Sequence, residues 1–122
     1  MTDKLNALIT LRDKVKAGDT PNQDEFRAVF GWHTDGRHQL AAIACEASDL
    51  RAMGAALALK DAVLPGWAWS VKTLATDNVQ AWTDSAYGLR QMGYIGTTRD
   101  NPARALLLAI LEALIAMEKQ HD

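Results

Sequence analysis

Residues 65–84 have the sequence PGWAWSVKTLATDNVQAWTD, and this stretch decides the fold class. From Trp67 to Thr73, large apolar residues alternate with small or charged ones, which is typical of a half-buried strand. A turn-forming Thr-Asp-Asn run follows at residues 76–78, and residues 79–84 form a second strand-like segment. We therefore predict a β-hairpin over residues 67–84, with residues 94–95 as a candidate third strand. Because a two-stranded hairpin is marginally stable in water, helices must cover it.

Helical periodicity flanks the hairpin on both sides. Apolar residues at helical spacing predict helices over residues 3–17, 37–47 and 49–63, and a last helix that begins at Asn101-Pro102. Thr20 as N-cap and Pro21 at the first position predict a short helix that ends at Gly31. Gly54 costs its predicted helix about 1 kcal/mol relative to alanine, and close helix packing is the expected compensation. The pattern predicts one α+β domain over residues 1–122: a small antiparallel sheet covered by helices from both ends of the chain.

Composition and charge restrict the class of protein. The chain has 122 residues, of which 48% are hydrophobic and 23% charged, and these ordinary globular values exclude a disordered chain. The net charge of −2 removes the general attraction to DNA that a basic surface provides, so nucleic acid is a disfavoured partner. The single cysteine excludes an internal disulfide, and the N-terminus has no secretory signal. No stretch reaches the roughly 20 apolar residues that span a bilayer, so we expect a cytoplasmic protein without membrane contact.

Three segments resemble a known group of proteins. They are LPGWAWSV at residues 64–71, Ala81-Trp82 on the next strand, and NPARALLLAILEAL at residues 101–114. With AALAL at residues 55–59, they resemble small phage and prophage proteins of alphaproteobacteria, which are similar to the phage ABA-sandwich group. The resemblance covers roughly residues 48–117 and implies a phage or prophage origin, a bacterial host cell and a small sheet between helices. The group offers no catalytic residues to carry over, so the resemblance leaves the activity open.

The tryptophans of the hairpin are the first candidate site. Trp67 and Trp69 share one face of the predicted strand, and Trp82 follows on the second strand. Packing of these rings against the helices is the favoured interpretation, because tryptophan supplies a large share of a small core. The alternative is an exposed platform that stacks the bases of a nucleotide or of single-stranded nucleic acid, with Lys72 near enough to meet phosphates.

A second candidate site is the cluster His33, Asp35 and His38, which carries side chains that bind metals. Its spacing matches no zinc signature, so surface or capping roles are favoured, and we expect no metal and no cofactor. Cys45 lies in an alanine-rich run that predicts a buried structural thiol. The aspartates at positions 77, 84 and 100 lie at a predicted turn, a strand end and a helix start, where aspartate has ordinary structural roles.

These observations favour a small non-enzymatic phage or prophage protein that binds a host or phage macromolecule, inhibition of a host defence system being one form of that role. Asp24 and Glu25 form a local acidic patch suited to a basic partner. A nucleotide or single-stranded nucleic-acid binder that uses the hairpin tryptophans is the alternative, and a metal-dependent enzyme is the third hypothesis. The last helix is apolar nearly all round, so residues 102–118, with Leu108 and Ile115 on the poorer face, are a candidate homodimer seam.

Overall fold

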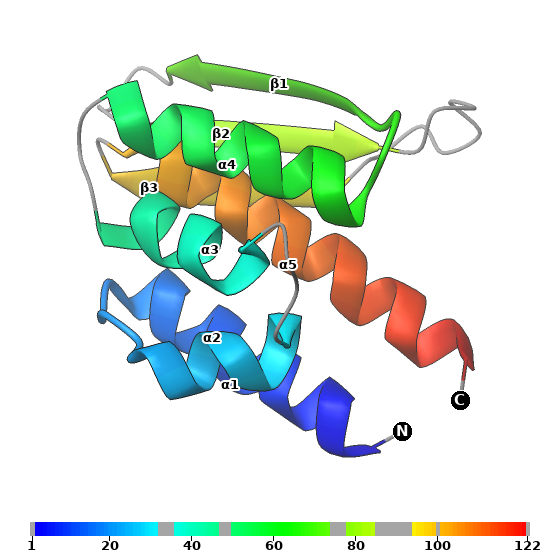
Figure 1. Cartoon of the computed structure of the whole chain (residues 1–122). Helices are drawn as coiled ribbons and strands as arrows, with labels where there is room; N and C mark the ends of the chain where they lie inside the picture. The colour runs from blue at the N-terminus through cyan, green and yellow to red at the C-terminus, as the bar shows by residue number, and fades with distance from the viewer. Residues whose placement is uncertain are drawn as a thin grey trace.

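Helices precede and follow a small sheet in this protein (Figure 1). The structure is a computed structural model that describes residues 2–31, 36–46, 50–73, 78–84, 94–99 and 101–121. Within these ranges the helices are α1 (Thr2–Ala17), α2 (Gln23–Phe30), α3 (Arg37–Glu46), α4 (Leu50–Val63) and α5 (Pro102–His121), and the strands are β1 (Ala68–Thr73), β2 (Asn78–Asp84) and β3 (Tyr94–Arg99). The predicted α+β class is confirmed. Among the helices of the described ranges, none has the length and apolarity needed to cross a membrane.

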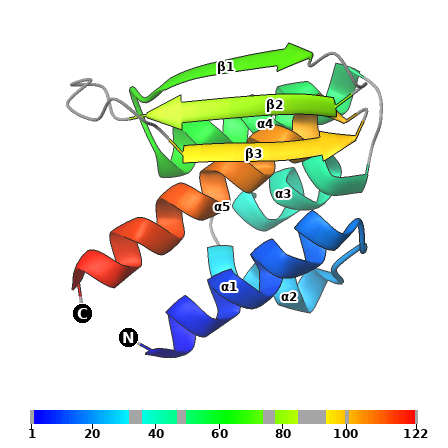
Figure 2. The ribbon, with the colours of Figure 1, turned by 180° about the vertical axis from the view of Figure 1, so that it is seen from behind.

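The three strands form one antiparallel sheet in the order β1-β2-β3, so that β1 and β3 are its edges (Figure 2). Trp69 of β1 lies opposite Thr83 of β2, which confirms the predicted hairpin. β3 extends the candidate third strand to six residues, with Tyr94 opposite Thr83. Opposite residues of an antiparallel pair share a face. Trp69, Thr83 and Tyr94 therefore lie on one face of the sheet, and Trp82 lies on the other.

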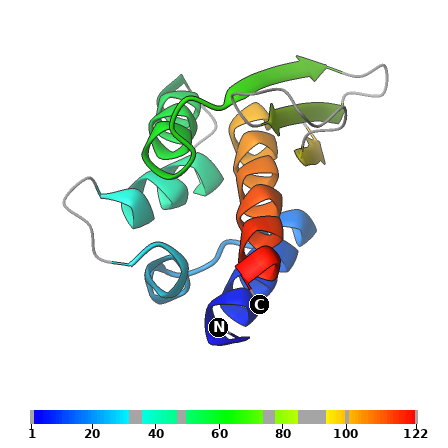
Figure 3. The same cartoon turned by 90° about the vertical axis from the view of Figure 1, so that its right-hand side faces the viewer.

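Helix α5 is the centre of the fold. Its residues from Ala103 to Leu111, apart from Arg104, are at most 3% exposed. The sheet lies on one side of this helix, and α1, α3 and α4 pack on its other sides (Figure 3). At Gly96 of β3 the sheet comes closest to α5, because a Cβ added there would lie 2.5 Å from Leu108 Cβ and 2.7 Å from Ala109 N. Only glycine permits this approach.

Arg104 ties the start of α5 to two other helices. Its Nη1 donates to the backbone carbonyls of Val15 and Asp19 at 3.0 and 3.1 Å, and its Nη2 donates to the carbonyl of Cys45 at 2.9 Å. The last carbonyls of a helix have no partner within the helix and carry partial negative charge, so a guanidinium satisfies them well. The one charged side chain near the N-terminus of α5 is thus a structural clamp between α1, α3 and α5.

Two details of the predicted helices are corrected by the structure. The N-cap of α2 is Asn22, two residues after Thr20, because Asn22 forms a reciprocal capping box with Glu25. That pair satisfies two backbone N–H groups at once. Gly54 of α4 has no atom within 4 Å of its added Cβ, so the expected close packing at this position is wrong. The predicted helix break at Ser48-Asp49 lies outside the described residues.

Candidate functional site

The hairpin tryptophans are divided between the two faces of the sheet. Trp67 and Trp69 lie on the face that carries Gly96 and α5, whereas Trp82 lies on the opposite face. Trp67 is half-buried, and its ring stacks on that of Tyr94, with the centroids 6.1 Å apart and the planes at 29°. Trp69 stays 43% exposed because α5 packs mainly on β2 and β3 and leaves the edge strand β1 less covered. The three rings therefore form no common platform.

The outer face of the sheet faces away from the described helices (Figure 3). Trp82 of β2 is half-buried there, and Ile95, which lies opposite it on β3, is 45% exposed. Lys72 is also exposed on this face, opposite Gln80. Of the residues proposed for base stacking, this face keeps one tryptophan and one lysine.

Of the candidate metal cluster His33, Asp35 and His38, one member lies in the described part of the chain, so its convergence stays untested. His38 of α3 is 4% exposed, and His33 and Asp35 lie outside the described residues. The surface position expected for His38 is wrong, because it shares the inward face of α3 with Ala41, Ala42 and Cys45. No group of three or more histidine, cysteine, aspartate or glutamate side chains in the described ranges is placed to hold a metal ion. Asp84 is buried at the end of β2, and Asp77 and Asp100 lie outside the described residues.

In the acidic patch at the start of α2, Glu25 makes structural contacts within the chain. Glu25 accepts a hydrogen bond from Lys14 of α1 and also closes the capping box with Asn22. The hydrogen bond from Lys14, supported by the backbone of Asn22, holds the pKa of Glu25 below its ordinary value. Asp24 is exposed, with Arg27 Nη1 at 3.4 Å from its Oδ1. Of the two residues proposed for a basic partner, Asp24 is the more accessible, with its side chain 90% exposed against 24% for Glu25.

Cys45 has the environment of a structural thiol. It is 1% exposed, and burial raises its pKa above the ordinary value. A thiol attacks as the thiolate, so a raised pKa makes this cysteine a poor nucleophile at neutral pH. Its backbone carbonyl, bound by Arg104, contributes to the clamp described above.

Five helix ends enclose a groove of about 310 Å³ on the side of the molecule where both chain ends lie (Figure 1). It is formed by the start of α1, the end of α2, the start of α3, the end of α4 and the last turns of α5. We call it the helix-end groove, and its lining residues are Lys4, Leu8, Val29, Phe30, Arg37, Ala62, Val63, Leu114, Met117 and Glu118. Ligand sites are typically concave, mostly apolar and upwards of about 300 Å³, with a few polar groups at defined positions.

The helix-end groove combines apolar walls with a positively charged margin. Leu8 and Phe30 are buried at 1% and 5% exposure, whereas Met117 is 36% exposed. The charged lining residues are Lys4, Arg37 and Glu118, so the margin carries one net positive charge. The groove is not evident from the sequence, because each helix end supplies only a few of its residues. The one signal in the sequence was the apolar stripe of the last helix, which continues to Leu114 and Met117.

The apolar surface that suggested a homodimer is largely used within one chain. Leu108 and Ile115 are 3% and 5% exposed, and Leu108 lies directly under Gly96. Homodimerisation through residues 102–118 stays a prediction, without the support that exposed apolar side chains at these two positions would give. The large apolar side chain that α5 does present to solvent, Met117, belongs to the helix-end groove.

Comparison with known proteins gives no relative for this chain: neither the family models, nor the curated proteins, nor the solved structures match it. The resemblance of residues 48–117 to small phage proteins stays a prediction. Inferences about function consequently rest on the residues and their geometry.

Proposed function

We propose that this protein is a non-enzymatic binding protein that takes the apolar face of a partner's helix into the helix-end groove. The observation that carries the proposal is the groove itself, about 310 Å³ in volume, in which leucine, valine, phenylalanine and methionine side chains lie beside the charged Lys4, Arg37 and Glu118. An amphipathic helix binds such grooves by inserting a few apolar anchors spaced three or four residues apart. In the phage setting implied by the resemblance, the partner is a host or phage protein, and blocking a host defence component is one form of the role.

The charged margin of the groove defines the chemistry of the partner further. Lys4 and Arg37 contribute two positive charges, and Glu118 contributes one negative charge. Opposite charges at the rim of an interface mainly raise the association rate and suppress wrong partners. We therefore expect a helix whose apolar anchors are flanked by aspartate or glutamate to bind better than one flanked by lysine or arginine.

The test uses a synthetic helical peptide of about 18 residues, with leucines along one face and glutamates beside them, and its counterpart with lysines. Ala62→Trp fills the groove from the end of α4 and is expected to weaken binding of the glutamate peptide at least about tenfold. Ala58→Trp is the matched control, because Ala58 is exposed on the same helix one turn earlier and does not line the groove. Equal binding by the wild type and the Ala62→Trp variant would overturn the proposal.

The nucleic-acid alternative keeps one supporting observation. Trp82, Ile95 and Lys72 lie on the outer face of the sheet, where an aromatic ring and a cation are available to a single strand. A fluorescently labelled oligothymidylate of about ten nucleotides distinguishes the two functions. Salt-dependent binding that is lost in Trp82→Ala would favour this alternative, and its absence together with peptide binding in the groove supports the proposed function.

A further inference from the structure

β3 is an edge strand of the three-stranded sheet of the described residues. Alternate backbone N–H and C=O groups of an edge strand point away from the sheet and are available to another extended chain. Proteins commonly protect such edges with charged side chains, and β1 carries Lys72 near its end. β3 on the opposite edge has no proline, and its one charged residue, Arg99, is its last residue.

A groove of about 220 Å³ runs beside this edge, on the side of β3 that is nearer to α1 (Figure 2). Leu108 of α5 is among its lining residues and is 3% exposed, while Ile95 is 45% exposed. Residues of α1, β3 and α5 line the groove: Arg12, Lys16, Ile95, Gly96, Thr97, Leu108 and Glu112. An edge strand and an adjoining groove are the two features that a domain needs to bind a peptide as an added strand.

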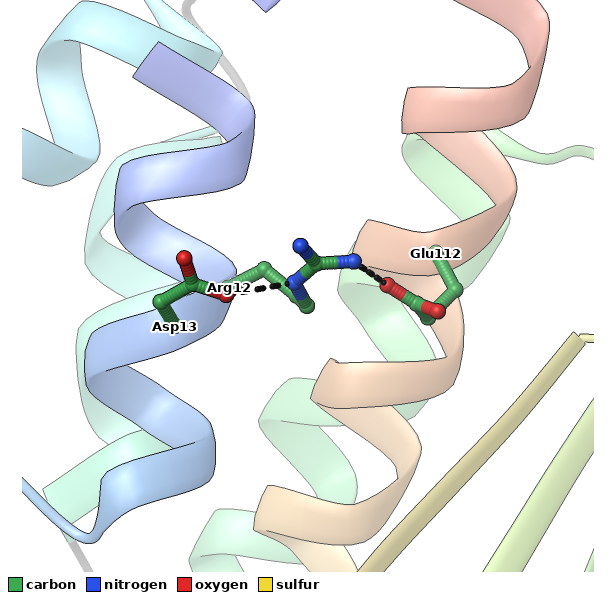
Figure 4. Close-up of polar contacts among 3 residues, drawn as sticks. All are labelled: Arg12, Asp13 and Glu112. Atoms are coloured by element: carbon green, nitrogen blue, oxygen red, sulfur yellow. Dashed lines mark hydrogen bonds and ion pairs between the residues drawn. The ribbon is translucent and has the colours of Figure 1, made fainter. Parts of the chain in front are cut away.

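An ion pair joins the two helices that line the groove. Arg12 reaches from α1 to Glu112 of α5, with 2.6 Å between Nη1 and Oε1, and its Nε donates to Asp13 at 2.8 Å (Figure 4). The hydrogen bond to Glu112 raises the pKa of Arg12, so this contact stays ionic at every physiological pH.

We infer that the outer edge of β3 binds an extended peptide with carboxylates at alternate positions, which adds to the sheet as a fourth strand. The backbone of the peptide pairs with β3, and side chains on one of its faces enter the groove over Leu108. The groove lining has two cations and one carboxylate, and Lys16, in the last turn of α1, is exposed. An acidic side chain projecting from the peptide is therefore favoured at the α1 wall, and a basic one is disfavoured.

The test uses the full chain with ¹⁵N label and the capped hexapeptide Val-Glu-Val-Glu-Val-Glu as probe. At about 1 mM peptide, we expect the fast-exchanging amides of β3 to become protected from hydrogen exchange at least about tenfold. Two peptide controls separate strand addition from side-chain contact. A version with alternate N-methylated amides keeps the side chains but cannot pair, and a Val-Lys version reverses the charge, so both should bind at least about tenfold more weakly.

Protein variants locate the peptide. Lys16→Glu is expected to weaken binding of the glutamate peptide about fivefold, and Lys119→Glu, at an exposed position of α5 that does not line this groove, should bind as the wild type does. Ala62→Trp leaves this binding unchanged, because the helix-end groove is a separate site. Absence of β3 protection, or equal binding of the N-methylated peptide, would overturn the inference. So would a dimer whose formation protects β3, because a second copy would then occupy the edge.

Discussion

The close approach of β3 to α5 at Gly96 makes a strong prediction about stability. In Gly96→Ala, the new methyl group would lie 2.5 Å from Leu108 Cβ and 2.7 Å from Ala109 N, and nearer still to the carbonyl oxygen of Ala105. Ordinary contacts of this kind are 3.4–4 Å. None of the three atoms can move by rotation of a side chain, because two belong to the backbone and the third is a Cβ. The strand and the helix must therefore separate by about 1 Å, which a close-packed interior resists.

The energetic cost follows from what α5 contacts. Overpacking in a core typically costs about 1–3 kcal/mol, and here the displaced helix also packs against α1, α3 and α4. We expect a loss of about 3–5 kcal/mol, out of a total stability of roughly 6–18 kcal/mol for a chain of 122 residues. Gly54→Ala is the matched control, because its methyl group meets nothing within 4 Å and should stabilise α4 by about 0.5–1 kcal/mol.

Urea unfolding, followed by far-ultraviolet circular dichroism and tryptophan fluorescence, measures both variants against the wild type. Substitution by alanine should lower the urea midpoint at Gly96 and raise it at Gly54. If Gly96→Ala loses less than about 1 kcal/mol, the strand and helix are not held at the described spacing, and the central role assigned to α5 is refuted.

Three further predictions concern the polar contacts and the thiol. Arg104→Met should lower the free energy of unfolding by about 2–4 kcal/mol, because three backbone carbonyls lose a charged donor. Chemical denaturation measures this loss, and a value under about 0.5 kcal/mol would contradict the clamp role of Arg104. Because Glu25 has a lowered pKa when folded, its stabilisation is present above the ordinary value of about 4.5 and is lost as the pH falls through the lowered one. The difference in melting temperature between the wild type and Glu25→Gln should therefore be largest at neutral pH and shrink in acid, and a pH-independent difference would contradict the contact with Lys14. Cys45 should react with an aromatic disulfide reagent far more slowly in the native than in the urea-unfolded protein, and faster in Arg104→Met; equal native and unfolded rates would show that the thiol is accessible.

Most secondary structure was predictable because its signals are local. The alternation after Trp67 predicts a strand, and Asn101-Pro102 before an apolar run predicts a helix start, which the structure confirms with Asn101 Oδ1 accepting from the Arg104 amide. The apolar residues all round the last helix were interpreted as a candidate homodimer seam, whereas most of them are buried within the chain, where α5 is the centre of the fold. The N-cap of α2 was misplaced because two cap-like residues lie two positions apart, and only the reciprocal hydrogen bonds distinguish them.

The orientation of Trp82 was not predictable, because it depends on register. Trp82 lies opposite Ser70. A shift of one residue would place it opposite Trp69 or Val71 and move it to the helix-facing side. The sequence of the turn does not determine that choice by itself. The helix-end groove has a different origin: its residues come from five helix ends, so no local pattern could indicate their convergence.

The position of α5 in the chain has a consequence for biosynthesis. Every other described element precedes it in the sequence, and α1, α3, α4 and the sheet all pack against it. On the ribosome these elements emerge before their common packing partner exists, and their apolar faces stay uncovered until residues beyond 102 are made. The elements that pack on α5 are therefore expected to reach their native structure cooperatively, after α5 has been synthesised. Contacts between segments as distant as Arg12 and Glu112 form in that step. A ribosome stalled before α5 would carry a chain with uncovered apolar faces, which is a substrate for a chaperone. Neither groove would yet be formed, because residues of α5 line both.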